Sequence, residues 1–99
     1  MPLAMDPAGN EIRALQKVAD WKGKRLLEIG CGDGRLTLRL AAFGPGTIEA
    51  IDPDVQLVRM ARKNLPPRYA GRIAYHAGHA EKLKYPADQF DIVLFAWAL

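Results

Sequence analysis

The segment LLEIGCGDGRL, residues 26–36, carries glycines at three alternate positions, Gly30, Gly32 and Gly34. Glycine permits tight turns and lets a ligand approach the backbone closely. The spacing differs from the dinucleotide fingerprint G-x-G-x-x-G, because position 35 is an arginine. The segment therefore predicts a ligand-binding loop of another kind.

Acidic residues around these glycines limit the ligands that the loop can accept. Glu28 ends the apolar run before the loop, Asp33 lies inside it, and Asp52 ends the next apolar run. Carboxylates at close range repel a pyrophosphate but tolerate a cation. In dinucleotide folds an acid about 20 residues beyond such a loop accepts hydrogen bonds from ribose hydroxyls. We therefore expect a nucleoside without phosphates that carries positive charge, and S-adenosylmethionine, with its sulfonium and α-ammonium groups, is such a molecule.

The elements that must position these residues alternate between strands and helices. Apolar runs predict strands at 25–29, 47–51, 72–76 and 90–97, and helical periodicity is present at 11–21, 35–43 and 54–65. Strands that alternate with helices imply parallel pairing through right-handed crossovers. We expect a Rossmann-like three-layer α/β sandwich with a parallel sheet in the order 3-2-1-4.

The periodicities also predict which helical faces are buried. In the first helix the apolar positions are Ile12, Leu15, Val18 and Ala19. In the third helix, Arg59, Arg62 and Lys63 are expected to face water. Asp91, beside the fourth strand, is expected to have a structural role.

Composition and length favour one small domain over residues 1–99, with an amino-terminal helical segment at 1–22. The 14 basic and 11 acidic residues give a net charge of +3, and the basic ones are too scattered to indicate a nucleic-acid partner. No apolar stretch reaches the length of a membrane span. The single cysteine and the lack of a secretory pattern predict a cytoplasmic protein. His76 and His79 are too few for a zinc site, so no metal is expected.

Three segments, taken in order, resemble the class I S-adenosylmethionine-dependent methyltransferases, in particular the group that acts on small molecules. LLEIGCGDGRL looks like the first family motif and IEAIDPD looks like the second. AGHAEKLKYPADQFDIVLFAWAL resembles the stretch that usually reads G-D-A-E followed by F-D-x-V. The resemblance covers Lys24 to Leu99, and it implies S-adenosylmethionine as the methyl donor, S-adenosylhomocysteine as the product and a small molecule as the acceptor.

The resemblance implies a role for each residue near the methionine portion of the cofactor. Gly30 and Gly32 would pass beside that portion, while Glu28 would order the loop and its ammonium contacts. Cys31 would contribute to the same loop as a small residue and not as a nucleophile, because no matching His and acid arrangement is evident. Phe95, together with Ala96, would line the methionine end.

At the nucleoside end, the resemblance implies that Asp52 holds the ribose hydroxyls. Asp52 has a second interpretation, as a cap of the helix that follows it. Pro53 would lie beside the adenine, and Ala80 would offer its backbone N–H to a ring nitrogen. His79 stands where the family usually has an aspartate that accepts from the adenine amino group. A neutral imidazole has one acceptor nitrogen, so we predict weaker cofactor binding than in relatives.

The family sheet has seven strands, and residues 1–99 match about its first half. The fold is therefore expected to be incomplete, with the apolar strand 90–97 left as an exposed edge that self-association or a partner would cover. Three function hypotheses follow. The first is the cofactor-binding part of a small-molecule methyltransferase, with catalytic residues unassigned. The second is a non-catalytic module that binds S-adenosylmethionine or S-adenosylhomocysteine, and the third is a nicotinamide dinucleotide site.

Replacement of His79 by aspartate is expected to tighten the binding of S-adenosylhomocysteine, because a carboxylate offers the adenine amino group more acceptor positions than an imidazole does. The gain should be roughly tenfold, the value of a hydrogen bond to a charged group. Calorimetric titration of both proteins measures it. An unchanged dissociation constant in His79→Asp would contradict the assignment of His79 to the adenine.

Overall fold

The computed structural model of the chain describes residues 2–5, 11–79 and 88–96. Five parallel strands form one sheet in the order β1-β5-β2-β3-β4. The strands are β1 (Pro2–Met5), β2 (Arg25–Ile29), β3 (Thr47–Asp52), β4 (Ile73–Ala77) and β5 (Ile92–Ala96). The four predicted strands correspond to β2 to β5, and their predicted order 3-2-1-4 is confirmed.

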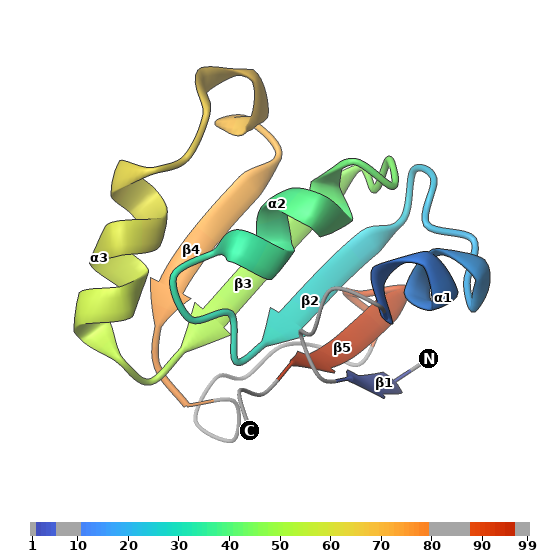
Figure 1. The fold of residues 1–99 in the computed structure, drawn as a ribbon, viewed down its shortest axis with the longest axis horizontal. Helices are drawn as coiled ribbons and strands as arrows, with labels where there is room; N and C mark the ends of the chain where they lie inside the picture. Colours follow the sequence, from blue (N-terminus) through green and yellow to red (C-terminus); the bar gives the residue numbers. More distant parts are fainter. Residues whose placement is uncertain (1, 6–10, 80–87, 97–99) are drawn as a thin grey trace.

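Three helices, α1 (Glu11–Lys17), α2 (Arg35–Ala41) and α3 (Val55–Lys63), lie on one face of this sheet (Figure 1). A short 3-10 helix, η1 (Pro67–Tyr69), precedes β4. Alternate strand residues such as Leu26, Ala50 and Leu94 belong to one core cluster with Leu40 of α2 and Val58 of α3. The described residues therefore build two layers of the Rossmann-like fold.

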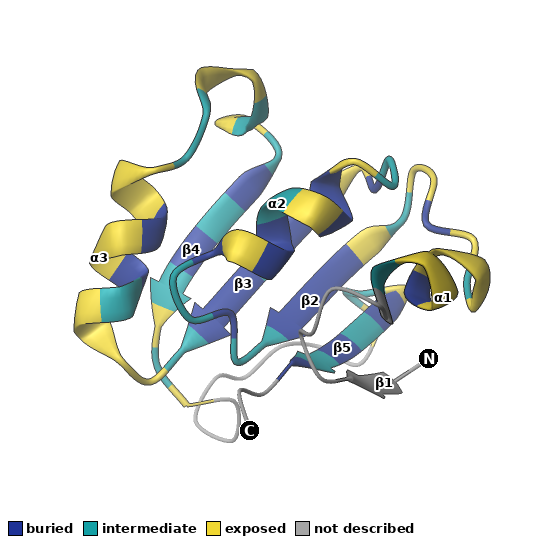
Figure 2. Cartoon of the chain, in the orientation of Figure 1, coloured by how far each residue is buried: buried dark blue, intermediate teal, exposed yellow. Residues whose placement is uncertain are grey.

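Strands β2 and β3 both have buried residues on their two faces, which is typical of a parallel sheet. Leu26 is fully buried against the helices, and its neighbour Leu27, which points to the opposite face, is 7% exposed. On β3 the same holds for Ala50 and Ile51, which are 0% and 1% exposed. Figure 2 shows this burial along the middle of the sheet, with exposed residues on the outer side of the helices.

Helix α3 begins at an acidic cap and packs through small apolar residues. The Asp54 carboxylate accepts hydrogen bonds from the backbone N–H groups of Gln56 and Leu57, at 2.9 and 3.1 Å. Arg59, Arg62 and Lys63 are exposed, as predicted. Arg62 also donates from Nε and Nη2 to the Tyr75 carbonyl oxygen at 3.1 and 2.6 Å, so its guanidinium ties α3 to β4.

The amino-terminal segment 1–22 differs from the helical prediction. It contains strand β1, and helix α1 ends at Lys17, four residues before Trp21. The Trp21 indole turns back, donates from Nε1 to the Leu15 carbonyl oxygen at 3.2 Å and packs on the Phe43 ring at 5.4 Å between centroids. The helical periodicity predicts that Val18 is buried, but Val18 is 51% exposed. Trp21, which is 3% exposed, packs in the core instead.

Strand β5 is not an edge of the sheet, which corrects the prediction made for residues 90–97. It lies between β1 and β2, and β1 pairs with it in parallel from Pro2 opposite Val93 to Met5 opposite Ala96. The backbone groups that an exposed edge would offer to another chain are therefore paired within this chain. Residues 97–99, the end of the predicted strand, lie outside the described residues.

A salt bridge joins the amino ends of β2 and β5. The Arg25 guanidinium donates from Nε to Asp91 Oδ2 at 3.2 Å and from Nη2 to Oδ1 at 3.1 Å. The backbone N–H of Arg25 also donates to Asp91 Oδ2, at 2.9 Å. These hydrogen bonds from Arg25 lower the pKa of the Asp91 carboxyl to about 2. Asp91 therefore has the structural role that the sequence predicts.

The Asp91→Asn variant should be less stable than the wild type at neutral pH and should lose this deficit in acid. The pKa of Asp91 is lower in the native state than in the unfolded chain, so the salt bridge contributes fully above pH 3.8 and fades as pH falls toward about 2. Denaturant titrations across this range measure the difference. Asp20→Asn, at an exposed position, is the matched control. A deficit that stays constant with pH would contradict this role of Asp91.

Candidate cofactor-binding site

The candidate site lies where the carboxyl ends of β2, β3 and β4 meet at one edge of the sheet. It is formed by the glycine loop (residues 30–34), the turn 52–54 after β3, and residues 78–79 after β4. Parallel strands bring all these connections to the same edge, which is where open α/β folds bind ligands. The structure thus brings together the glycines, Asp52 and His79, which are far apart in sequence.

Main-chain hydrogen bonds hold the glycine loop against β3. The N–H groups of Gly30 and Cys31 both donate to the Ile51 carbonyl oxygen, at 2.8 and 2.9 Å. The loop then turns, and the Gly34 N–H donates to the Cys31 carbonyl oxygen at 3.0 Å. The strand pairing of β2 and β3 therefore continues into the loop and fixes where it begins.

The glycines of the loop serve two different purposes. All three have positive φ angles, 89° at Gly30, 56° at Gly32 and 89° at Gly34. A Cβ atom added to Gly32 would meet no atom within 4 Å, so this backbone is open to a ligand. A Cβ atom at Gly34 would lie 2.7 Å from the Tyr75 hydroxyl and 3.1 Å from Ala61 Cβ. Gly34 is therefore required for close packing of α2, and Gly32 leaves space at the site.

Asp52 joins the two loops at the centre of the site. Its Oδ2 accepts a hydrogen bond from the Gly32 N–H at 2.9 Å, and its Oδ1 accepts one from the Asp54 N–H at 2.8 Å. Asp54, and not Asp52, caps helix α3. The alternative role of Asp52 as a helix cap is therefore wrong, and its carboxylate lies beside the open backbone of Gly32.

Glu28 is a fully buried carboxyl beneath the glycine loop. Its Oε1 accepts a hydrogen bond from the Thr37 hydroxyl of α2 at 2.5 Å, and its Oε2 has no hydrogen-bond partner among the described residues. Burial raises the pKa of the Glu28 carboxyl to about 7, opposed by the bond from Thr37 and assisted by the negative charge of Asp52. A positive charge above the loop would favour the ionised form.

Cys31 is a packing residue of the loop. Its side chain is buried, and burial together with the charges of Glu28, Asp52 and Asp33 raises the pKa of the thiol to about 12. A thiol with so high a pKa is not a nucleophile at neutral pH. The same convergence of carboxylates makes the site favourable for a cation.

The remaining predicted residues lie at different distances from this centre. The Gly78 N–H donates to the Asp52 carbonyl oxygen at 3.0 Å, which brings the exposed His79 next to the turn that holds the exposed Pro53. Phe95 pairs with Ile29 at the start of the loop, but its neighbours Leu94 and Ala96 pack toward the helices. Its side chain therefore lies on the opposite face from Glu28. Ala80 lies outside the described residues.

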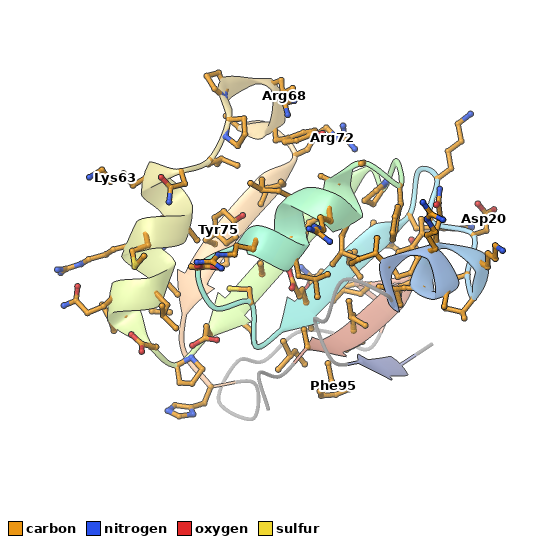
Figure 3. All side chains as sticks on the ribbon, viewed as in Figure 1. Asp20, Lys63, Arg68, Arg72, Tyr75 and Phe95 are labelled. Carbon is orange, nitrogen blue, oxygen red and sulfur yellow. The ribbon has the colours of Figure 1, made fainter. Side chains whose placement is uncertain are left out.

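Two residues at the site were missed by the sequence analysis. Thr37 is fully buried and bonded to Glu28, and Tyr75 approaches Gly34 from β4, between α2 and α3 (Figure 3). Thr37 stands one residue after Leu36 and three before Leu40, so helical spacing places it on the buried face. A polar residue on a buried face needs a hydrogen-bond partner. The sequence could therefore have indicated that Thr37 has such a partner.

Two further findings concern the described residues only. The His76 ring nitrogen Nε2 lies 2.6 Å from Glu49 Oε2. No group of three His, Cys, Asp or Glu side chains in residues 2–5, 11–79 and 88–96 could hold a metal ion. Within the same residues, every helix is too short or too polar to span a bilayer.

Comparison with known families identifies the class of protein. The sequence pattern of the methyltransferase domain family matches residues 26–99, which include the glycine loop, Asp52 and strands β2 to β5. The chain therefore belongs to this family. The resemblance seen in the sequence motifs is confirmed.

Two curated relatives show how much of such a protein the chain represents. It is 37% identical over 76 residues to magnesium-protoporphyrin O-methyltransferase of Rhodobacter capsulatus, and this match covers 76% of the chain and 32% of the relative. It is 36% identical over 87 residues to a ubiquinone biosynthesis O-methyltransferase of Azorhizobium caulinodans, with 87% and 32% covered. The chain spans about a third of the length of these relatives.

A solved structure agrees with the fold. An S-adenosylmethionine-dependent methyltransferase from Mesorhizobium loti superposes with a TM-score of 0.72 at 24% identity. The match covers 87% of this chain and 37% of that one. The sheet and helices described above are thus the arrangement of a known methyltransferase fold, present here in part.

Replacement of Glu28 by glutamine should change how stability depends on pH. The native carboxyl keeps its proton up to about pH 7, whereas the unfolded one loses it near 4.5, so the wild type loses stability as pH rises between these values. The loss is on the order of 3 kcal/mol, and Glu28→Gln should lack it. Thermal or denaturant unfolding from pH 5 upward measures both slopes. Both proteins share every other titratable group, so identical slopes would contradict a buried, shifted Glu28.

Proposed function

We propose that the chain is the cofactor-binding part of an S-adenosylmethionine-dependent methyltransferase that acts on a small molecule. The observation that carries this proposal is the open backbone at Gly32, with the Asp52 carboxylate at 2.9 Å from its N–H and the buried Glu28 beneath the loop. An open glycine beside two acids suits a ligand that joins a ribose to a cationic amino acid.

The residues at the site fit such a cofactor. Each oxygen of Asp52 accepts one bond from a loop N–H, and a carboxylate has about four acceptor positions, which leaves two for the hydroxyls of a ribose. The methionine portion would pass over Gly30 and Gly32, where the carboxylates of Glu28 and Asp52 would favour its sulfonium and ammonium groups. Asp33 is already paired with Arg35, at 2.9 Å. Asp52 would thus hold the sugar while the loop receives the cationic end.

The adenine would lie between Pro53 and the segment after β4. The hydrogen bond from the Gly78 N–H to the Asp52 carbonyl oxygen holds these two connections side by side. His79 would offer one acceptor to the adenine amino group, and Ala80 would offer its N–H. Phe95 would approach from β5, beside the start of the glycine loop.

S-adenosylmethionine supplies a methyl group that is already activated by its sulfonium. Methyl transfer therefore depends mainly on holding the acceptor in line, and a general base is needed only when the acceptor must lose a proton. The two relatives are named as O-methyltransferases of porphyrin and quinone compounds, which favours a small-molecule acceptor here. We place the acceptor-binding part in the portion of the relatives that the chain does not span.

A non-catalytic role is the second candidate. The chain would then bind S-adenosylmethionine or S-adenosylhomocysteine and act through a partner chain or through self-association. Methyl transfer to a panel of acceptors, with and without an added carboxyl-terminal part of a relative, separates the two. Turnover in either mixture supports the enzyme, and binding without turnover in both supports the module.

We also propose a cytoplasmic location. Cys31 is the single cysteine of residues 1–99, a free and buried thiol, so these residues contain no internal disulfide, which suits a reducing compartment. Localisation of a fluorescently tagged chain in cells tests this proposal.

The Asp52→Asn variant should bind S-adenosylhomocysteine roughly tenfold more weakly than the wild type, because the hydroxyls of the ribose lose hydrogen bonds to a charged acceptor. Calorimetric titration measures the change. Asp54→Asn is a matched control two residues away, since asparagine caps helices as well as aspartate does. Equal affinities of wild type and Asp52→Asn, or tighter binding of NAD than of S-adenosylhomocysteine to the wild type, would contradict the proposed function.

A further inference from the structure

Two polar side chains are fully buried in the described part of the chain, and they bind each other. Glu28 and Thr37 both have an exposure of 0%, and the Thr37 hydroxyl donates to Glu28 Oε1. A buried carboxyl without a partner is costly, so this bond is a major support of Glu28 in the core. Neither the family motif nor the sequence analysis assigns a role to Thr37.

The position of this pair relative to the glycine loop gives it a consequence for the site. Glu28 lies two residues before Gly30, and Thr37 lies three residues after Gly34. The hydrogen bond therefore ties the end of β2 to the first turn of α2, directly across the base of the loop. It fixes the distance that the loop must span, and with it the open backbone at Gly32.

Tyr75 of β4 packs next to Gly34, at the start of the helix that carries Thr37. Its hydroxyl lies so close to Gly34 that a Cβ atom there would be 2.7 Å away. Burial raises the pKa of Tyr75 to about 12, opposed by a hydrogen bond with Thr37. The Tyr75 hydroxyl of β4 thus lies near Thr37 of α2, whose own hydroxyl donates to Glu28.

The second oxygen of Glu28 remains available for an interaction. Oε2 is buried and has no hydrogen-bond partner in the described part of the chain. Besides Thr37, the groups that interact electrostatically with Glu28 are Asp52 of β3, Cys31 of the loop and Tyr75 of β4. The pKa values of Cys31 and Tyr75 are both raised to about 12, so neither of them gains or loses a proton near neutral pH. The charge beneath the loop near neutrality therefore depends on Glu28.

We propose that Thr37 and Tyr75 are positioning residues of the cofactor site, whose hydroxyls hold the Glu28 carboxyl beneath the glycine loop without touching the cofactor. This inference rests on the proposed function and deepens it. With Thr37 in place, Oε1 is held by α2, Oε2 has no partner in the described part of the chain, and the carboxylate would favour the cationic end of a ligand above it. Tyr75 packs against Gly34 at the start of α2 and so helps to hold the helix that carries Thr37.

The test is a cycle of variants at Thr37 and Glu28. Valine has the shape of threonine without its hydroxyl, so Thr37→Val should weaken S-adenosylmethionine binding roughly tenfold, the value of a bond to a charged group. Thr37→Ser keeps the hydroxyl and should bind within about threefold of the wild type. Thr47→Val, the same change at an exposed threonine at the far end of β3, should leave the affinity unchanged. Tyr75→Phe should give a smaller loss than Thr37→Val.

Two readouts separate positioning from a general loss of structure. If Thr37 acts through Glu28, Thr37→Val should cost no further affinity in a Glu28→Gln background. The affinity of the wild type should also rise with pH as Glu28 ionises. Thr37→Val should shift this rise to higher pH, because the bond from Thr37 lowers the pKa of Glu28. Glu28→Gln keeps every other titratable group and therefore shows the part of the profile that does not come from Glu28.

Each outcome decides between the inference and the proposed function. Full additivity of Thr37→Val and Glu28→Gln, or a pH profile unchanged by Thr37→Val, overturns the positioning role while the wild type still binds the cofactor. A wild type that binds neither S-adenosylmethionine nor S-adenosylhomocysteine overturns the proposed function, and the inference with it. Loss of affinity in Thr37→Val, rescue in Thr37→Ser and a shifted profile support the positioning role.

Discussion

The arrangement of the site depends on the carboxylate of Asp52, which accepts hydrogen bonds from the N–H groups of Gly32 and Asp54 at 2.9 and 2.8 Å. These bonds join the glycine loop to the turn after β3, and they are possible because β2 and β3 are parallel neighbours whose carboxyl ends meet. Parallel pairing of two strands that are adjacent in sequence requires the crossover helix α2. The glycine loop, the helix and the acid are therefore consequences of one topology, and a ligand at this edge contacts all three.

Charge gives the site its chemical preference. Glu28, Asp33 and Asp52 lie around an open backbone. Burial, assisted by the charges of these carboxylates, raises the pKa of the Cys31 thiol to about 12. The same charges disfavour a pyrophosphate and favour a cation. Burial of Glu28 with one bonded and one bare oxygen is unfavourable for folding. A positively charged ligand above the loop would offset this cost of burying the Glu28 carboxyl.

Much of the fold could be predicted from the sequence, because strands β2 to β5 are apolar runs with a clear period, and Gly44, Pro45, Pro66 and Pro67 mark the helix ends. Strand β1 could not, since four residues carry little periodicity and their partner β5 lies near the other end of the chain. The glycines and acids of the site follow from their types and spacing. The Thr37 and Tyr75 contacts depend on how α2 packs on the sheet. Sequence spacing indicates which face of α2 is buried, but it does not give the residues that this face contacts.

The central claim is that a cationic nucleoside lies across the glycine loop and Asp52. Backbone amide resonances of the chain, followed by two-dimensional NMR during addition of S-adenosylmethionine, test it most directly. The account predicts that the largest shifts occur at residues 30–34, at Asp52 and at His79, with little change at the amino ends of the strands. Shifts that fall elsewhere, or that NAD produces at these residues and S-adenosylmethionine does not, would contradict it.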